Sequence, residues 1–517
     1  MASEADSSSI LSGTGTRSTA GGVIARQDRI PIWSLSYLFI GIIGIGFLFT
    51  FYDIFDITVS FIQTCTQIVP GCNPENSSTY LGLPVELNLA GYVVGALVLS
   101  PLADRFGRRN MLLFTLLLTG LGSLYTAFVN DYTSFIIART ITGIGIGADL
   151  ALVNTYINEM APISGRARYT SLIFIMSALG AFFGIWLGLW LTTPPANFPS
   201  GLPFALATVQ LTPSGPEFLG IGWRIMYIIG ALLALVGILL RFQLPESPRW
   251  LISRGRVDEA DKIVANMEER ARRTVPDLPA PAAELPVQSG ATRIPYAEIF
   301  SNRLYLQRTV LLVVIWFLGY VTIYAIAQGL TTLLAGIIPP PANLPPPVAA
   351  AAVAGQAGMI AAFGTFGFIA TAVFAYFFGE SLERKLWLPI AALLTVIGTM
   401  LIAVFASSNF ALAAIGSIIT FFGFNLWVPM TYAWSAENYP TRARATGFAL
   451  VDGVGHLGGG VGILFIAPLI PTLLASLGAT TGSIVIFLII DAFLIVAAII
   501  AQFGTATRRK RLDEVSP

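Results

Sequence analysis

The chain has 517 residues, of which 55% are hydrophobic and only 11% are charged, and its mean hydropathy is +0.75. Charged residues make up about a quarter of an ordinary soluble domain, so this composition excludes a soluble globular protein. The net charge of +1 gives no indication of nucleic-acid binding. The sequence has no metal-ligand spacing, nucleotide loop or nucleophile constellation. We therefore expect an all-α integral membrane protein that is not an enzyme and binds no metal or cofactor.

The N-terminal segment, residues 1–30, is rich in Ser, Thr and Gly and lacks an early apolar core. This composition predicts a disordered tail rather than a signal peptide. Twelve apolar runs follow, each of a length that suits a helix crossing about 30 Å of hydrocarbon. The predicted spans are 33–63, 80–103, 110–129, 134–160, 168–192, 222–243, 308–336, 352–379, 386–406, 410–436, 446–474 and 480–504.

The positions of lysine and arginine predict the orientation of these spans. Nearly all of the 29 Lys and Arg residues fall in the two tails and in the loops on one side, which places both termini in the cytosol. The cytosolic loop 244–307 divides the chain into an N-terminal half, 31–243, and a C-terminal half, 308–504. A basic tail, 505–517, ends the chain.

The central loop begins with amphipathic spacing that predicts a surface helix, and a Pro/Ala-rich linker follows it. The apolar positions of this helix are Ala260, Ile263, Val264 and Met267.

The first outer loop contains both cysteines, Cys65 and Cys72, and an Asn-x-Ser sequon at Asn76. Seven residues apart on the oxidising side of a membrane, the cysteines can form a disulfide or remain as two free thiols. We predict the disulfide. A second outer loop, 193–221, is rich in Pro and Gly and is expected to be irregular. Glycosylation at Asn76 depends on the host.

One motif occurs twice. The run that starts at Arg139 ends in Glu159-Met-Ala-Pro and Arg166, and the same ending recurs as Glu437-Asn-Tyr-Pro and Arg444. In both copies the proline follows the glutamate by three residues and the arginine by seven. This repeat predicts a duplicated membrane protein with one gate in each half.

The loop after the second span reads Asp104-Arg105-Phe-Gly-Arg108-Arg109, and it resembles the loop signature of the major facilitator superfamily. The segment that contains Glu380 and Arg384 is similar to a degenerate second copy. The resemblance implies two pseudo-symmetric six-helix bundles that alternate access around a central site. Carboxylates facing arginines would latch the cytosolic side. The predicted gate residues are Asp104, Arg105, Arg108, Glu159, Arg166, Glu380, Arg384, Glu437 and Arg444.

Within that superfamily, the sequences at 222–224 and 245–251 resemble both the sugar porters and the organic-ion carriers, which include niacin and aromatic-acid carriers. Span seven carries Trp316, Tyr320 and Tyr324 in a pattern similar to the organic-ion branch. Only Gln328 stands where sugar porters have paired glutamines, and Phe174 stands where they have a sugar-binding glutamine. The resemblance therefore favours the organic-ion branch, although His456 occupies a position where bacterial members often carry Arg.

Ionisable residues inside a membrane each cost a few kcal/mol unless they are paired or hydrated. Asp53 and Asp56 share one face of span one, and Asp53 is expected at a depth close to that of Arg139. Asp53 fits the position of the sugar porters' proton-coupling aspartate. The pair is either a proton-coupling site or a static ion pair. Asp149 is either a relay, a cation-attracting group or a structural acid near Asn154.

The predicted substrate contacts combine aromatic faces with a few polar tips, which suits a small amphipathic solute. Asp452 and His456 are spaced i, i+4 and can touch, either as a pH-sensitive pair or as a packing pair. Asp491, on the last span, is expected to be structural. The predicted substrate residues are Phe174, Tyr320, Tyr324, Gln328, Asn425, Trp427, Asp452 and His456.

Together these features predict a monomeric carrier in the plasma membrane that couples transport of a small organic acid or organic ion to protons, with a proton gradient in place of a cofactor. Three alternatives stay open: a sugar or polyol symporter, an exporter of drugs or metabolites, and a non-transporting sensor.

Overall fold

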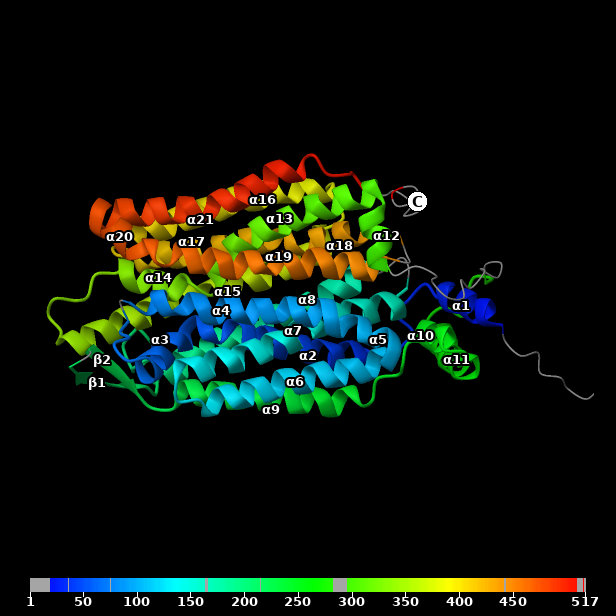
Figure 1. Cartoon of the computed structure of the whole chain (residues 1–517), viewed down its shortest axis with the longest axis horizontal. Helices are drawn as coiled ribbons and strands as arrows, with labels where there is room; N and C mark the ends of the chain where they lie inside the picture. The colour runs from blue at the N-terminus through cyan, green and yellow to red at the C-terminus, as the bar shows by residue number, and fades with distance from the viewer. Residues whose placement is uncertain are drawn as a thin grey trace, which may run out of the picture.

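The computed structural model describes residues 19–35, 37–74, 76–162, 166–213, 215–281, 295–440, 443–508 and 515. Twelve helices in this part of the chain are long and apolar enough to cross a membrane, which confirms the twelve predicted spans. They lie side by side (Figure 1), and the loop between Arg241 and Arg303 divides them into two groups of six. The end of the predicted Pro/Ala linker and most of the basic tail lie outside the described residues.

The N-terminal half consists of spans one to six. Spans one and two are each built from more than one helical segment, and the other four spans are single helices. The segments are α2 (Tyr37–Phe55), α3 (Ile57–Ile68), α4 (Ser77–Val94), the π-helical turn η1 (Gly95–Leu99), α5 (Ser100–Phe106), α6 (Arg108–Phe128), α7 (Tyr132–Met160), α8 (Arg166–Thr192) and α9 (Gly222–Arg241).

The C-terminal half also consists of six spans, and spans seven, ten and eleven are each interrupted between two helical segments. Pro429 explains the second break, because it has no N–H to donate to the carbonyl group four residues earlier. The segments are α13 (Arg303–Ala327), α14 (Leu330–Ile337), α15 (Pro346–Phe378), η3 (Arg384–Leu386), α16 (Trp387–Phe405), α17 (Phe410–Leu426), α18 (Val428–Glu437), α19 (Arg444–Ile466), α20 (Leu469–Leu477) and α21 (Ala479–Ala501).

One end of the molecule, which we call the terminal side, carries α1 (Ala20–Asp28), α10 (Pro248–Ser253), α11 (Val257–Arg272) and α12 (Pro295–Ser301) (Figure 1). Helix α1 corrects the prediction of a disordered tail for residues 20–28, while residues 1–18 of that tail lie outside the described residues. The Thr19 hydroxyl oxygen caps α1 by accepting from the Gly22 N–H at 3.1 Å, and Val23 is buried against α10 and α11. Contacts with α10 and α11 therefore order this segment, although its composition alone suggests disorder.

Helix α11 is the amphipathic element of the central loop. It buries Ala260, Val264 and Met267, while its charged side chains hold α1. Arg26 lies 2.5 Å from Asp261 and 2.7 Å from Glu268, and Arg29 lies 2.6 Å from Glu268. Helices α1, α10 and α11 thus form a small assembly on the terminal side.

The opposite end, which we call the hairpin side, carries β1 (Thr208–Thr212) and β2 (Gly215–Leu219), which pair antiparallel with Thr208 opposite Leu219. This hairpin corrects the prediction of an irregular loop over 193–221. The alternating, β-branched sequence of β1 suits a strand. Cys65 and Cys72 form the disulfide that the sequence predicts, at the end of α3.

The loop that precedes β1 leaves the N-terminal half and lies on the C-terminal half. Phe198 packs edge-on against Phe410, with ring centroids 5.1 Å apart. The Ser200 carbonyl lies so close to Gly355 on α15 that a Cβ at Gly355 would overlap it. The two halves are therefore in direct contact on the hairpin side.

Candidate functional site

Asp53 and Arg139 meet inside the N-terminal half, as their depths predict. The Arg139 guanidinium lies 3.0 Å from the Asp53 carboxylate and also donates to the Asp53 carbonyl at 2.8 Å. Both side chains are completely buried. Asp56 lies beside this pair, 3.8 Å from the same guanidinium. One arginine thus faces two acids, and its charge is shared between them.

Ser123, on α6, completes this site, and sequence reasoning missed it. Its hydroxyl donates to the second oxygen of the Asp53 carboxylate. The Asp53 carboxylate is therefore held by α6 and α7 together. Asn88, on α4, donates to the Arg139 carbonyl at 2.6 Å. This bond connects α4, a helix at the boundary between the halves, to the acid–arginine pair. Small polar residues are common in membrane helices, so no motif distinguishes Ser123 in the sequence.

Asp149 lies elsewhere, ten residues along α7 from Arg139, or about 15 Å at 1.5 Å per residue. Its carboxylate forms a two-pronged ion pair with Arg241, at 2.5 and 3.0 Å, and accepts from Thr115 at 3.0 Å. Asn154, the neighbour that the sequence suggests, donates instead to the Leu150 carbonyl. This arrangement matches the structural role among the predicted alternatives.

Buried rings from both halves fill the middle of the molecule and form what we call the central aromatic cluster. The rings of His456 and Tyr92 stack with centroids 3.9 Å apart, and Tyr320 covers His456 at 4.0 Å. The members are Tyr92 and Phe174 of the N-terminal half and Trp316, Tyr320, Tyr324, Trp427, Tyr432 and His456 of the C-terminal half.

Asp452 is the charged group of this cluster. It accepts from the Tyr92 hydroxyl at 2.7 Å and from the Tyr320 hydroxyl at 2.9 Å. The His456 Nδ1 atom lies 3.5 Å from the Asp452 carboxylate and 2.8 Å from its carbonyl. The predicted Asp452–His456 contact is thus present, and Tyr92 extends it into the other half.

The other predicted substrate residues have different surroundings. Phe174 packs edge-on against Tyr432 across the seam, at 5.3 Å. The Trp427 ring lies in the cluster, and its indole N–H is buried without a hydrogen-bond acceptor among the described residues. In contrast, the amide of Asn425 donates to its own helix at Phe421. The amide of Gln328 donates across the seam to the Ile54 carbonyl at 2.9 Å.

The predicted gate residues form ion pairs at the terminal ends of the spans. Arg108 lies 3.2 Å from Glu159, and Arg384 lies 3.2 Å from Glu437 and 3.0 Å from Glu380. These pairs occupy equivalent positions in the two repeats, and each connects neighbouring spans of one half. Latching of the two halves by these residues stays a prediction. The side chains of Asp104, Arg166 and Arg444 lie outside the described residues, and Arg105 is exposed against the Phe106 ring.

Two further acids, which the sequence analysis did not include among the gate residues, accept hydrogen bonds from backbone N–H groups close to these ion pairs. The Glu246 carboxylate accepts from the backbone N–H of Arg108 at 3.0 Å. Burial raises the pKa of Glu246, although the backbone N–H groups around it favour the ion. The Glu383 carboxylate accepts from the N–H of Thr507 at 3.0 Å. Burial opposes its ionisation, but the backbone N–H groups outweigh burial and lower the pKa of Glu383.

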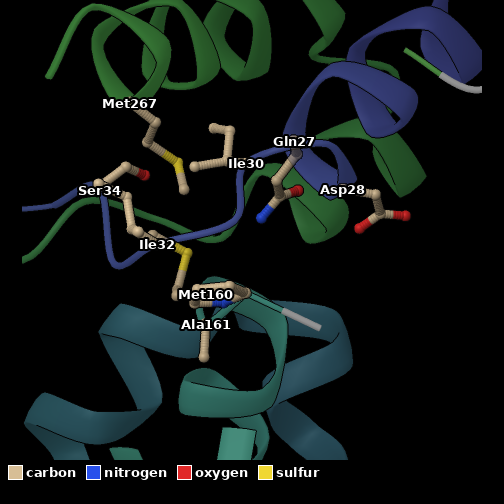
Figure 2. A pocket seen from close by; sticks show the side chains of 9 residues that line it. Gln27, Asp28, Ile30, Ile32, Ser34, Met160, Ala161 and Met267 are labelled. Atoms are coloured by element: carbon tan, nitrogen blue, oxygen red, sulfur yellow. The ribbon is translucent and has the colours of Figure 1, made fainter. Parts of the chain in front are cut away.

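Figure 2 shows a small cavity between α1, α11 and the end of α7. Gln27 points into the gap below α1 and donates to the Glu159 carbonyl at 2.7 Å. The cavity is therefore part of the junction between α1 and the gate of the N-terminal half. Its lining residues are Gln27, Asp28, Ile30, Ile32, Ser34, Met160, Ala161, Pro162 and Met267.

Two six-span halves that enclose a buried acid–arginine pair and an aromatic centre are the architecture of a transporter of the major facilitator superfamily. The sequence profile of the family described as "Sugar (and other) transporter" matches residues 38–335, which is more than half of the chain. The chain therefore belongs to that family.

Relatives with curated names agree with this assignment. The chain is 27% identical over 509 residues to the niacin transporter NiaP of Acinetobacter baylyi, which covers 95% of this chain and 99% of the relative. It is 28% identical over 388 residues to the 4-hydroxybenzoate transporter PcaK of the same organism, with 73% and 74% covered. The chain is a multi-pass membrane transporter of an organic solute and not an enzyme.

Solved structures agree at the level of the fold. The partially occluded, inward-open xylose transporter XylE of Escherichia coli superimposes with a TM-score of 0.63 at 19% identity, covering 92% of this chain and all of that one. This likeness supports the same helical arrangement and carries no information about the solute.

Proposed function

We propose that this protein is a proton-coupled symporter of a small aromatic carboxylic acid. It works by alternating access as a monomer in the plasma membrane, with the proton gradient as its energy source. The single observation that carries the proposal is the fully buried Asp53 carboxylate, held between Arg139 and Ser123. Two of the relatives transport niacin and 4-hydroxybenzoate, and both of these solutes are aromatic acids.

The acid–arginine pair supplies a route for coupling. While the Arg139 guanidinium contacts Asp53, the carboxylate stays ionised because the opposite charge stabilises the ion. When Arg139 moves toward an anionic substrate, Asp53 loses its counter-charge in a dry site and takes up a proton. Asp56, 3.8 Å from the guanidinium, adds a second acid to the same exchange. Substrate binding and proton binding then support each other.

The central aromatic cluster is the proposed substrate site. Aromatic faces favour stacking with another ring. The Tyr92 and His456 rings already stack, and the Tyr320 ring lies tilted against His456. The unused Trp427 indole N–H and the His456 imidazole are donors for a carboxylate. A planar aromatic acid matches both features, with its ring between the aromatic side chains and its carboxylate on the donors.

The proposed orientation places the terminal side in the cytosol. Lys and Arg are concentrated in the loops of that side, which is the pattern of cytosolic loops in membrane proteins. The disulfide lies on the opposite side, as expected for an oxidising compartment.

A sugar or polyol symporter is the second candidate, because the family includes sugar transporters. The polar side chains that a sugar needs are occupied, however. Gln328 donates to Ile54, Asn425 donates to Phe421, and Phe174 offers only a ring. We therefore rank the aromatic acid first.

Uptake into proteoliposomes tests the proposal. With an acidic exterior, the purified protein should accumulate labelled nicotinate or 4-hydroxybenzoate, and xylose should not accumulate. Asp53→Asn should abolish accumulation driven by the gradient while exchange of internal and external substrate continues. The matched control is Asp491→Asn, a buried acid on α21 that accepts from Thr399 and should keep accumulation. Normal accumulation by Asp53→Asn would refute the coupling, and accumulation of xylose alone would refute the substrate class.

A further inference from the structure

Helices α4 and α19, one from each half, cross antiparallel with their backbones in contact at the boundary between the halves (Figure 1). A Cβ added to Gly82 would lie 3.0 Å from the Leu464 Cα, and one added to Gly460 would lie 2.5 Å from the Glu86 Cα. This seam has to separate whenever the carrier opens on the hairpin side. Side chains enclosed in it therefore experience two different environments during one transport cycle.

Glu86 is an acidic side chain of this seam, and the residue is partly buried. Its Oε2 atom is buried and has no hydrogen-bond partner among the described residues. Gly460 leaves the space that this oxygen occupies, since a Cβ there would overlap Oε2. Glu86 is nine residues from the start of α4, which corresponds to about 14 Å below the hairpin end of the helix. The carboxyl group is thus at a depth where water is scarce.

The charged groups on the helices packed against α4 are already engaged. On α19, Asp452 accepts from Tyr92 and Tyr320, and His456, one turn from Gly460, lies between the same two rings.

On α7, the Arg139 guanidinium pairs with Asp53, and Asp149 pairs with Arg241. The described segments α3 and α14, which also pack on α4, contain no charged residue. Among the described side chains of these helices, no cation therefore neutralises an ionised Glu86 in the closed seam.

An ionised carboxylate in the middle of a membrane helix is costly, so the closed seam favours the neutral acid. When the seam opens, water can solvate the carboxylate, and the proton passes from Oε2 to water. A ligand that binds one of two states better shifts the equilibrium toward that state. Here the ligand is the proton and the favoured state is the closed seam.

We infer that protonation of Glu86 favours closure of the α4–α19 seam. Glu86 acts as a positioning residue, and it is a different proton-binding group from the acid–arginine pair. The inference deepens the proposed function and rests on proton-coupled transport, because it assigns a second proton-binding group to the same cycle. It concerns the conformational step and leaves the substrate contacts unchanged.

Distance measurements between two spin labels test the inference without substrate. Thr79 on α4 and Leu469 on α20 are exposed at the hairpin end of the seam, and each can be replaced by cysteine for labelling. The native cysteines are bonded to each other, so they do not react with the label. The full chain in lipid nanodiscs would be measured from about pH 5 to about pH 9.

Raising the pH should move the labelled protein from the short to the long distance, with the ratio changing by up to about tenfold per pH unit for one proton. Glu86→Gln should stay at the short distance throughout, because the amide cannot ionise. Glu86→Asp should keep the response with a shifted midpoint, which a merely structural role would not produce. The control Glu269→Gln, whose side chain is 70% exposed, should behave as the unmodified chain.

A seam that does not respond to pH, or a response that persists in Glu86→Gln, would overturn the inference. Asp53→Asn in the labelled chain separates the two proposals. Loss of the response with Asp53→Asn but not with Glu86→Gln would assign the proton to Asp53 and overturn the role of Glu86. Normal accumulation by Asp53→Asn, with a response that depends on Glu86, would refute the Asp53 coupling and leave the Glu86 inference standing.

Discussion

Arg241 ends α9, yet its guanidinium turns back into the bundle and is completely buried. It donates to the Leu112 carbonyl at 2.8 Å as well as to both oxygens of Asp149. One side chain therefore connects α9, α6 and α7. Buried ion pairs of this kind contribute little when compared with apolar replacements, but loss of one partner leaves a charge without compensation.

The variant Arg241→Met should therefore destabilise the protein by about 3–5 kcal/mol, because Asp149 remains buried without its partner. The double variant Arg241→Met with Asp149→Asn should recover most of that loss. Thermal unfolding in detergent measures both. Arg256→Met, which breaks an exposed pair with Glu259, serves as the control and should leave the stability nearly unchanged. A double variant as unstable as the single one would contradict this account.

The buried residues of the site show what the sequence can and cannot predict. Asp53 and Arg139 were predictable as a pair because helical rise places them at similar depths. A basic residue at the end of a span usually anchors the helix at the membrane surface, so the inward turn of Arg241 was not predictable. Tyr92 was also missed, since one of 16 tyrosines outside any motif carries no signal.

At the scale of elements, α1 shows how charge determines the position of a short helix. Two arginines of α1 converge on Glu268 of α11, and Asp28 at the end of α1 lies 2.5 Å from Arg249 of α10. Isolated helices of nine residues are unstable in water, so this helix depends on its partners. The sequence of α1 alone did not predict it, because its stability comes from contacts with residues more than 200 positions away.

This dependence gives α1 a pH response. Burial opposes ionisation of Glu268, but the hydrogen bonds and charges of Arg26 and Arg29 outweigh burial and lower its pKa below the ordinary value of 4.5. A carboxyl group with a lowered pKa stabilises the folded state above its unfolded pKa and loses that contribution as the pH falls through its folded pKa. Docking of α1 should be constant at neutral pH and weaken below about pH 4.5.

A spin label at Ile24, a partly buried position of α1, measures this undocking as increased mobility between pH 7 and pH 3. Glu268→Gln should raise the mobility already at pH 7. The control Glu259→Gln changes an exposed carboxylate on the same helix and should leave the mobility at pH 7 as it is. Equal mobility at pH 7 in the unmodified chain and in Glu268→Gln would exclude this role for Glu268.

At the scale of the whole molecule, two hydrogen bonds close the hairpin side between the halves. The Thr58 hydroxyl donates to the Ala327 carbonyl at 2.9 Å, and the Gln328 amide donates to the Ile54 carbonyl at 2.9 Å. Both lie where span one meets the break in span seven. They stabilise only the state in which this side is closed, so they set part of the balance between the two states.

Removing either bond should therefore favour opening. A buried hydrogen bond contributes about 1 kcal/mol, so Thr58→Ala or Gln328→Ala should each raise the open-to-closed ratio on the hairpin side about fivefold. Spin-label distances between α3 and α14 measure that ratio. Thr332→Ala is the matched control, because the Thr332 hydroxyl donates within its own segment, to Gly329. An unchanged ratio in both test variants, or the same increase in the control, would show that these bonds do not control closure.

The number of spans and their division into two halves were predictable because apolar length and the positions of charge follow directly from the bilayer. The contacts between the two halves were not predictable. Contacts such as those of Thr58 and Gln328 join residues about 270 positions apart, and they depend on how the two halves meet. Ordinary polar residues make these contacts, and no local pattern marks them.

The contact between Ser200 and Gly355 has a mechanical consequence. When two bundles rock about their centre, the rim of the molecule travels farthest, and this contact lies on the rim with no clearance between the two backbones. Packed interfaces of this kind switch between arrangements and do not deform continuously. The loop must therefore separate from α15 before the two halves can move apart on this side. Small fluctuations do not open this side of the molecule, and opening occurs in one step.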